Sequence, residues 1–230
     1  MTKVFIDGSA GTAGLRIHSR LENRADLELI TLTGEARKDP AARNAALNSC
    51  DLAVLCLPDA ASREAVAMIE NPAVRVVDTS TAHRVAPGWA YGFPELSAAR
   101  REAIVSGARV ASPGCHAGGF IVLVQPLIEA GLLPSSAKLC CHSLTGYSGG
   151  GKGMIADYEA EDRDVKFDSA RPYGLGQTHK HLPEMQGITG LDCPPVFCPI
   201  VADYYCGMVV TVPLFAEQLN PGFGIEDVKA

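Results

Sequence analysis

The chain has 230 residues, 47% hydrophobic and 20% charged, which is ordinary for a globular protein and leaves room for two modest domains. Its net charge of −6 and the lack of a Lys/Arg run exclude nucleic acid as the main partner. No apolar stretch reaches transmembrane length, and the N-terminus enters a strand directly, so we expect no membrane association and a cytoplasmic location.

The N-terminal stretch predicts a dinucleotide-binding turn. A buried strand over 3–7 runs into a glycine-rich turn over 8–14 and then into an amphipathic helix over 15–21. Gly8 would permit the tight turn, Gly11 the approach of the backbone to a pyrophosphate, and Gly14 the close packing of helix on strand. The predicted cofactor contacts in this turn are Gly8, Ser9, Ala10, Gly11, Thr12, Ala13 and Gly14.

The end of the second strand indicates which dinucleotide is bound. That strand is expected over 27–32, and an Asp or Glu at its end would suit the ribose hydroxyl of NAD. Thr33, Arg37 and Lys38 follow instead, and hydroxyls with cations suit the 2′-phosphate of NADP. Glu35 in the same loop leaves NAD open, so NADP is the favoured cofactor rather than the only one.

Strands and helices alternate through the first half of the chain. Further strands are expected over 51–57, 75–78 and 109–111, and helices over 41–48, 62–70 and 98–106, with an irregular connection over 89–96. This alternation predicts a parallel sheet with right-handed crossovers. Leu57 and Pro58 follow the third strand and are candidate cofactor neighbours, and Arg84, in a polar loop after the fourth, is a candidate contact for an anionic substrate.

A single cysteine stands where a nucleophile would be expected. Cys115 follows a short strand and a Pro-Gly turn, and we expect a helix whose first turn begins near Cys115 and which continues through the apolar run over 120–133. The free N–H groups and the positive end of a helix beginning near Cys115 would favour its thiolate, so we expect a lowered pKa. A nucleophilic cysteine needs such a pKa.

The second half of the chain changes character. We expect a strand over 138–144, a glycine-rich loop over 145–153, an acidic helical segment over 154–168, a helix starting within 177–184, and strands over 196–201 and 208–214. The loop lacks the Ser/Thr of a Walker motif after its Gly-Lys pair. Close approach of its backbone to a ligand is the better interpretation, with Gly149 and Gly151 as further cofactor contacts.

Two histidines flank Lys180 and invite a pairing with Cys115. Placed on a helix, His179 and His181 would point in different directions, so one could reach the thiol while the other contacts substrate or packs. His142, on a strand of the second half, stays open as a rival for the acid/base role.

Eight cysteines raise the question of disulfides or a metal. There is no CxxC pair, so in a cytosolic chain they indicate reduced and mostly buried thiols. Cys193, Cys198 and Cys206, even with His179 or His181, match no compact zinc site. We therefore expect no metal.

Five motifs in order resemble the N-acetyl-gamma-glutamyl-phosphate reductase family, of the shorter-chain type, within the semialdehyde dehydrogenase superfamily. The similarity runs from Val4 to about Leu214. Its parts are the turn over 8–14, the Tyr-Gly-Phe-Pro-Glu-Leu run over 91–96, Ser-Pro-Gly-Cys over 112–115, Gly-Tyr-Ser-Gly-Gly-Gly-Lys over 146–152, and Ser-Ala-Arg-Pro-Tyr over 169–173 followed by His-Lys-His-Leu-Pro-Glu over 179–184.

The resemblance implies an enzyme that reduces N-acetyl-glutamyl 5-phosphate with NADPH, in arginine biosynthesis, through a thioester on Cys115. It implies that His179 and His181 supply acid/base and substrate contacts, without deciding between them, and that Ser148, Arg171, Tyr173 and Glu184 contact substrate. Alternatives are a dehydrogenase for aspartyl or N-acetyl-aminoadipyl phosphate, and a non-catalytic module that senses NADP.

The fold class that follows is α/β. We expect a Rossmann-type doubly wound parallel sheet over 1–112, followed over 113–230 by an α+β substrate domain of the semialdehyde and glyceraldehyde-3-phosphate dehydrogenase kind. Members of the family continue beyond the point where this chain stops, so we expect that domain to be incomplete at its C-terminus. The expected partners are a small-molecule substrate and further copies of the chain, as a dimer or tetramer.

Overall fold

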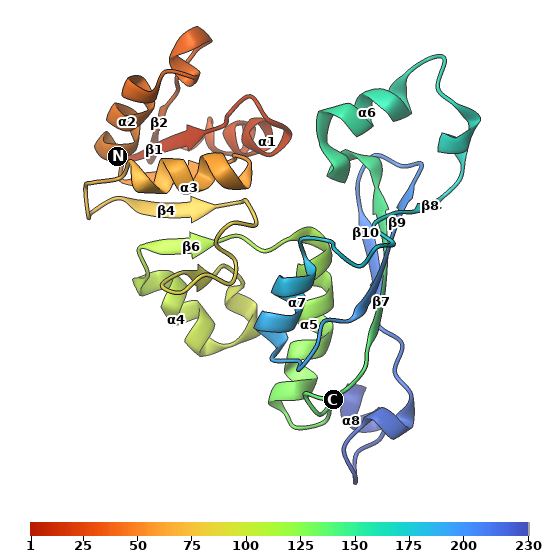
Figure 1. Cartoon of the computed structure of the whole chain (residues 1–230). Coiled ribbons are helices and arrows are strands. Elements are labelled where there is room, and N and C mark those ends of the chain that lie inside the picture. The colour runs from red at the N-terminus through yellow and green to blue at the C-terminus, as the bar shows by residue number, and fades with distance from the viewer. Residues whose placement is uncertain (230) are drawn as a thin grey trace. The chain divides into compact units, whose positions relative to one another are not determined.

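The computed structural model describes residues 1–229, which divide into two units between Pro113 and Gly114 (Figure 1). The sequence placed this boundary one residue earlier. Among residues 1–229, none of the helices combines the length and the apolar character that crossing a membrane demands.

The first unit is built on short strands whose side chains are apolar on both faces. It contains β1 (Thr2–Asp7), β2 (Leu27–Ile30), β3 (Leu52–Leu55), β4 (Arg75–Asp78), β5 (Ala90–Tyr91) and β6 (Arg109–Ala111). Its helices are α1 (Thr12–Leu21), α2 (Pro40–Ser49), α3 (Asp59–Ala67) and α4 (Ala98–Ser106), with 3-10 turns at Gly34–Arg37 and Pro94–Leu96.

All pairings in this sheet are parallel, in the order β2-β1-β3-β4-β6-β5. The chain moves outward from β1 to β2 and then returns to place β3 on the other side of β1. The carboxyl ends of β1 and β3 therefore flank a topological switch point, where doubly wound sheets bind their ligands. The predicted Rossmann-type sheet is confirmed.

Both faces of the sheet are covered, as its apolar strands require. Phe5 and Leu55 pack on one face with Leu47 of α2, whereas Val4 and Ile6 face the other way, toward the side chains of α1. The sequence missed β5, because its two residues lie in a stretch too short to show a strand pattern.

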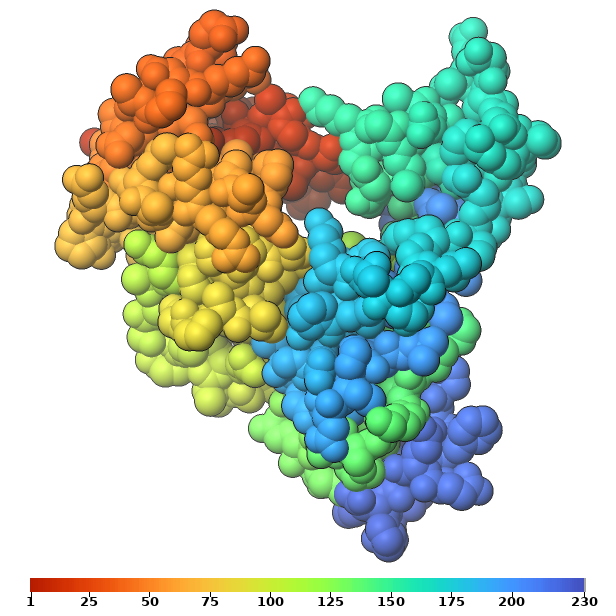
Figure 2. All heavy atoms as spheres, in the orientation of Figure 1, coloured from red at the N-terminus to blue at the C-terminus, as the bar shows by residue number. Residues whose placement is uncertain are grey.

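The second unit is a mixed sheet with helices. It contains α5 (Cys115–Glu129), β7 (Cys140–Gly146), α6 (Gly151–Glu159), β8 (Arg171–Pro172), α7 (Leu182–Thr189), β9 (Val196–Ala202), β10 (Met208–Thr211) and α8 (Ile225–Lys229). The strand order is β10-β7-β9-β8, with β7 and β9 parallel and the two outer pairings antiparallel. In the space-filling view, the segment around α6 projects at one end of this unit and α8 lies at the other (Figure 2).

Helices α5 and α7 pack together on one face of this sheet, and Gly119 of α5 lies directly against Val210 of β10. Residues of β7 alternate between this covered face and an open one. Cys141 and Ser143 are buried, whereas His142 between them is exposed. The two faces of β7 therefore carry different chemistry.

Several predicted element boundaries in this unit differ from the structure. The helix start near Cys115 is confirmed, but this helix ends at Glu129 rather than at Leu133, since Gly131 then takes a positive φ of 70°. The loop expected over 145–153 contains a 3-10 turn and the start of α6, with Gly151 at φ 79° where the chain changes direction. The helix expected within 177–184 starts only at Leu182, because Pro183 fits the first helical turn and no later position.

Candidate active site

The turn after β1 contains three glycines, and packing within the fold requires only two of them. Gly8 has φ 85°, and a Cβ there would overlap the Cys56 carbonyl. A Cβ on Gly14 would overlap the Gly8 carbonyl. At Gly11 the nearest atom would be 3.4 Å away, an ordinary packing distance. Packing therefore explains Gly8 and Gly14, whereas Gly11 leaves a surface that a ligand can approach.

Gly11 is also the N-cap of α1 and offers no side chain to cap the helix. The N–H groups of the first turn of α1 consequently face outward with the positive end of the helix dipole. A helix N-terminus of this kind binds phosphate groups. The cradle fits a dinucleotide pyrophosphate.

A pocket of about 600 Å³ lies at the switch point of the first sheet. Seven predicted cofactor contacts line it: Gly8, Ser9, Ala10, Gly11, Arg37, Leu57 and Pro58. Thr33 lines an adjoining hollow of about 380 Å³, together with Arg37. Thr12, Ala13 and Gly14 line neither, because they form the first turn of α1 behind the cradle.

The pocket wall is cationic. Arg37, Lys38 and Arg43 all line it. The Nη2 of Arg43 lies 2.9 Å from Oδ2 of Asp7, and both side chains are buried. Sequence reasoning missed Arg43, although an arginine on the otherwise apolar inner face of α2 was a signal for it. The pair ties α2 to the end of β1, which leaves the exposed Arg37 and Lys38 for an anionic ligand.

Arg84 does not occupy the exposed position expected of a substrate contact. It is 8% exposed, and its guanidinium donates to the backbone carbonyls of Thr79 and Ser112. These bonds tie the loop after β4 to the end of β6. The nearby His83 is buried as well, bonded to Asp78 and stacked on Trp89. This region of the first unit is held by its own polar network.

In the second unit, Cys115 is the first residue of α5, and its side chain is exposed. The turn before it is fixed by a carboxylate: the Gly114 N–H donates to Oε1 of Glu184 at 2.7 Å. Glu184 is 2% exposed and stands in the first turn of α7. Glu184, which the sequence predicted as a substrate contact, holds the backbone from which Cys115 projects.

A cluster of rings lies beside Cys115, and its centre is a residue that sequence reasoning missed. His116 is 3% exposed, with Nδ1 2.6 Å from Ser143 Oγ and Nε2 2.8 Å from the Tyr173 hydroxyl. Burial, and to a smaller extent the nearby His179, lowers the pKa of His116 to about 4. His116 is therefore neutral at pH 7 and orients Tyr173.

His179 and His181 converge in this ring cluster, contrary to the expectation that they point apart on a helix. Their ring centroids are 4.7 Å apart and lie 5.9 and 5.6 Å from that of His116. They converge because they precede α7, in a turn where the His181 N–H donates to Nδ1 of His179 at 3.2 Å. Since Nδ1 accepts, the neutral His179 ring carries its proton on Nε2.

Exposure distinguishes the two histidines. His181 is 5% exposed, whereas His179 is half-buried. Burial, followed by the charge of Lys180, lowers the pKa of His179. A neutral, partly accessible imidazole with its N–H at Nε2 can donate a hydrogen bond to a bound substrate. His142 is not in the ring cluster, because its side chain lies on the open face of β7.

The remaining predicted substrate contacts lie in two places. Tyr173 follows β8, and its burial, with a smaller contribution from Cys115, raises the pKa of its hydroxyl to about 12. Arg171 lies against the rings of Tyr158 and Phe167 and donates to the Tyr158 hydroxyl. Ser148 and Gly149 lie in the 3-10 turn after β7, where the Ser148 N–H donates to the Tyr205 carbonyl at 2.9 Å, and Gly151 begins α6.

Comparisons with known proteins match each of the two units to a separate family model. The family model for "Semialdehyde dehydrogenase, NAD binding domain" matches residues 3–104, and that for "Semialdehyde dehydrogenase, dimerisation domain" matches residues 115–229. The first match contains the glycine turn and its pocket. The predicted domain for a nicotinamide cofactor is thereby confirmed.

Two relatives that are similar along nearly the whole chain are N-acetyl-gamma-glutamyl-phosphate reductases. The N-acetyl-gamma-glutamyl-phosphate reductase of Burkholderia cenocepacia is 48% identical over 227 residues, which cover 99% of this chain and 72% of the relative. The one from Trichormus variabilis is 48% identical over 229 residues, covering 97% and 71%. The aspartate semialdehyde dehydrogenase structure from Francisella tularensis aligns with a TM-score of 0.67 at 14% identity, over 100% of this chain and 79% of that one, and so shows the fold alone.

Replacing two glycines of the turn should separate folding from cofactor binding. Gly14→Ala is expected to lower the free energy of unfolding by about 1–3 kcal/mol, because its Cβ meets backbone that cannot move away. Gly11→Ala should change that free energy by less than about 1 kcal/mol yet weaken NAD(P)H binding about tenfold. Urea denaturation and fluorescence titration measure the two effects. Wild-type cofactor affinity in Gly11→Ala would contradict the proposed cradle.

The buried His116 should make stability fall in mild acid. Its pKa is about 4 in the folded chain against 6.5 unfolded, so between these values only the unfolded state takes up the proton. The free energy of unfolding should therefore drop by about 3 kcal/mol as pH falls from 6.5 to 4. His116→Gln removes the titrating group and should flatten this part of the curve. Equal slopes for the two proteins would show that His116 is not the group.

Proposed function

The chain belongs to the N-acetyl-gamma-glutamyl-phosphate reductase family, and we propose that it reduces N-acetyl-L-glutamyl 5-phosphate to N-acetyl-L-glutamate 5-semialdehyde and phosphate, a step of arginine biosynthesis. The observation that carries the proposal is an exposed Cys115 at the start of α5, held by Glu184 and flanked by the ring cluster. This is the arrangement that acyl transfer to a thiol requires.

The first chemical step needs only residues of the second unit. The Cys115 thiolate attacks the acyl carbon, the bond from that carbon to the phosphate oxygen breaks, and phosphate leaves with the electron pair. The product is a thioester on Cys115. The N–H groups of Cys115, His116 and Ala117 lie in the first turn of α5, whose N-cap glycine offers no side chain to occupy them. They support the negative charge that develops on the acyl oxygen.

A nicotinamide cofactor, when bound, supplies the hydride that takes the acyl group to the aldehyde level. The groups that support its binding are the cradle of Gly8–Gly11 and the pocket wall. NADP is the favoured form, because Arg37 is exposed at the junction of the pocket and its neighbouring hollow, beside Thr33. Gly149 and Gly151, in the glycine-rich segment that follows β7, are proposed as further cofactor contacts.

His179 is the residue we propose to move the proton during the reduction. Its ring is half-buried, and its pKa is lowered. To donate a proton, the ring first takes up a proton at Nδ1, in place of the bond from the His181 N–H, and then releases the Nε2 proton to the substrate oxygen. His181, buried at the start of α7, holds the Nδ1 side of His179 through its backbone N–H. Tyr173 and Arg171 are proposed substrate contacts, with Arg171 as the cation for an anionic group.

We also propose that the chain forms a homo-oligomer, a dimer or a tetramer. The match of residues 115–229 to a dimerisation domain supports this. So does the open face of the second sheet, where Val196 of β9 and Val209 of β10 are 56% and 62% exposed.

Replacing the proposed nucleophile should abolish turnover without affecting the cofactor site. Cys115→Ser is expected to bind NADPH with wild-type affinity, because the cradle lies in the other unit, and to show no phosphate-dependent reduction of NADP by N-acetylglutamate semialdehyde. Cys206→Ser, which removes another exposed thiol, should retain activity. Substantial turnover in Cys115→Ser would disprove the covalent mechanism. A panel with aspartate semialdehyde and the N-acetyl-aminoadipyl analogue tests the substrate separately.

The proton-transfer role makes a separate quantitative prediction. His179→Gln should lower kcat by about 10²–10⁴-fold with little change in KM, the usual contribution of a general acid/base. The acid limb of the pH–rate profile should disappear in the same variant. If His181→Gln shows the loss of that limb and His179→Gln does not, the roles of the two histidines are the reverse of those proposed.

The cofactor preference should depend on Arg37. Loss of a charge-assisted hydrogen bond costs about 1.5–3 kcal/mol, so Arg37→Ala is expected to weaken NADPH binding roughly 10–100-fold while NADH binding changes little. Arg24→Ala is the matched control, because Arg24 is exposed and paired with Asp26 away from the pocket. Equal loss for NADPH and NADH would show that Arg37 does not read the 2′-phosphate.

A further inference from the structure

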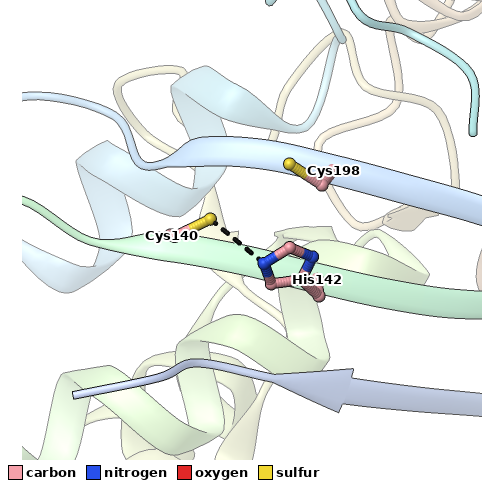
Figure 3. Close-up of side chains that lie close together, drawn as sticks. All are labelled: Cys140, His142 and Cys198. Carbon is pink, nitrogen blue, oxygen red and sulfur yellow. Dashed lines mark hydrogen bonds between the residues drawn. The ribbon is translucent and has the colours of Figure 1, made fainter.

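A second group of reactive side chains lies on the open face of the second sheet. Cys140 and His142 come from β7 and Cys198 from β9. Figure 3 shows the two thiols and the imidazole directed toward one another across the adjacent strands. None of them takes part in the chemistry proposed for Cys115.

Strand geometry explains why these three residues meet. Cys140 and His142 are two positions apart, so both point to the same face of β7. In the parallel pairing of β7 with β9, Cys198 stands opposite His142. Cys141 and Ser143, at the alternate positions of β7, point to the covered face, where Ser143 forms a hydrogen bond with His116. The two sites are therefore separated by the thickness of one strand.

The distances suit a tetrahedral metal ion. The Cys140 Sγ is 3.4 Å from Nε2 of His142, and all three possible ligand atoms lie within 4.8 Å of one another. Zinc with Zn–S near 2.3 Å and Zn–N near 2.0–2.1 Å requires ligand atoms about 3.6–3.8 Å apart. Small side-chain rotations would reach that spacing, since His142 is exposed and the two cysteines are half-buried.

The chemistry of the ligands favours zinc over harder cations. Two sulfurs and one imidazole nitrogen are soft or borderline donors, which select Zn²⁺ rather than Mg²⁺ or Ca²⁺. A bound metal would hold both cysteines as thiolates and would offset their negative charges.

We propose that Cys140, His142 and Cys198 bind one Zn²⁺ per chain, which leaves a fourth coordination position for a further ligand. This revises the expectation of no metal: Cys198 is a ligand, but its partners come from β7 rather than from Cys193, Cys206 or the histidines before α7. The metal would clamp β7 to β9. Because binding displaces thiol protons, affinity should weaken as pH falls.

The test measures how much zinc the full chain binds, and how tightly. Reduced, metal-free protein is titrated with zinc in competition with a chromophoric chelator. Cys115→Ser serves as the background, so that the exposed nucleophile cannot bind the ion. One equivalent should bind. Cys140→Ser, Cys198→Ser and His142→Gln should each weaken binding by more than the roughly 10–100-fold that loss of an outer-shell partner costs. The matched controls Cys193→Ser and Cys206→Ser should bind as the background does.

Cobalt gives a readout that does not depend on the variants folding. Co²⁺ added to the background protein should produce a thiolate-to-metal charge-transfer band and the intense visible bands of tetrahedral coordination. Absence of both bands would overturn the proposal, as would zinc binding that survives all three replacements. If the reduced protein binds no zinc and mass spectrometry finds a Cys140–Cys198 disulfide after air oxidation, the group is a redox pair and not a metal site.

Discussion

The catalytic unit depends on one short hydrogen bond, from the Gly114 N–H to the Glu184 carboxylate. It joins the residue before α5 to the first turn of α7, two segments 70 positions apart in the sequence. A charged acceptor makes this bond stronger than one between neutral groups. The position of Glu184 at a helix N-terminus further stabilises its charge. With both helix starts fixed, Cys115 at one and the His179–His181 turn at the other come to the same region.

The polar side chains near that bond form hydrogen bonds with one another, and these bonds fix their orientations. His116 connects Ser143 of β7 to Tyr173, and the His181 N–H fixes the tautomer of His179. Such buried networks are costly when a member is missing but specify a single arrangement when complete. The reacting thiol is the exposed member of this arrangement, as a nucleophile that must meet substrate should be.

Strand β7 shows how one element serves two purposes. Its alternation of side chains gives Cys141 and Ser143 to the covered face and Cys140 and His142 to the open one. Position in the sequence therefore does not decide which of these residues reaches the site. His142 and Ser143 are neighbours in the chain, yet only Ser143 contacts the ring cluster, through its hydrogen bond to His116. The same alternation places two cysteines and a histidine from adjacent strands close enough to share a cation.

Local pattern by itself determined much of this protein. Apolar runs and the residues that end them predicted β4, α4 and β6 at their observed bounds. The glycine-rich turn after β1 predicted the position of the cofactor pocket. Those features depend on residues close in sequence, whose period and backbone freedom are local properties. The nucleophile at the start of α5 was visible for the same reason.

Only the tertiary structure decided which distant side chains meet. The burial of Arg84 and Glu184, the central position of His116, and the convergence of His179 with His181 all depend on contacts between separate elements. Composition and spacing do not encode such contacts, because the partner of a buried polar group is chosen by packing and by strand register. The Cys140–His142–Cys198 group likewise exists only because β9 pairs with β7 in one register.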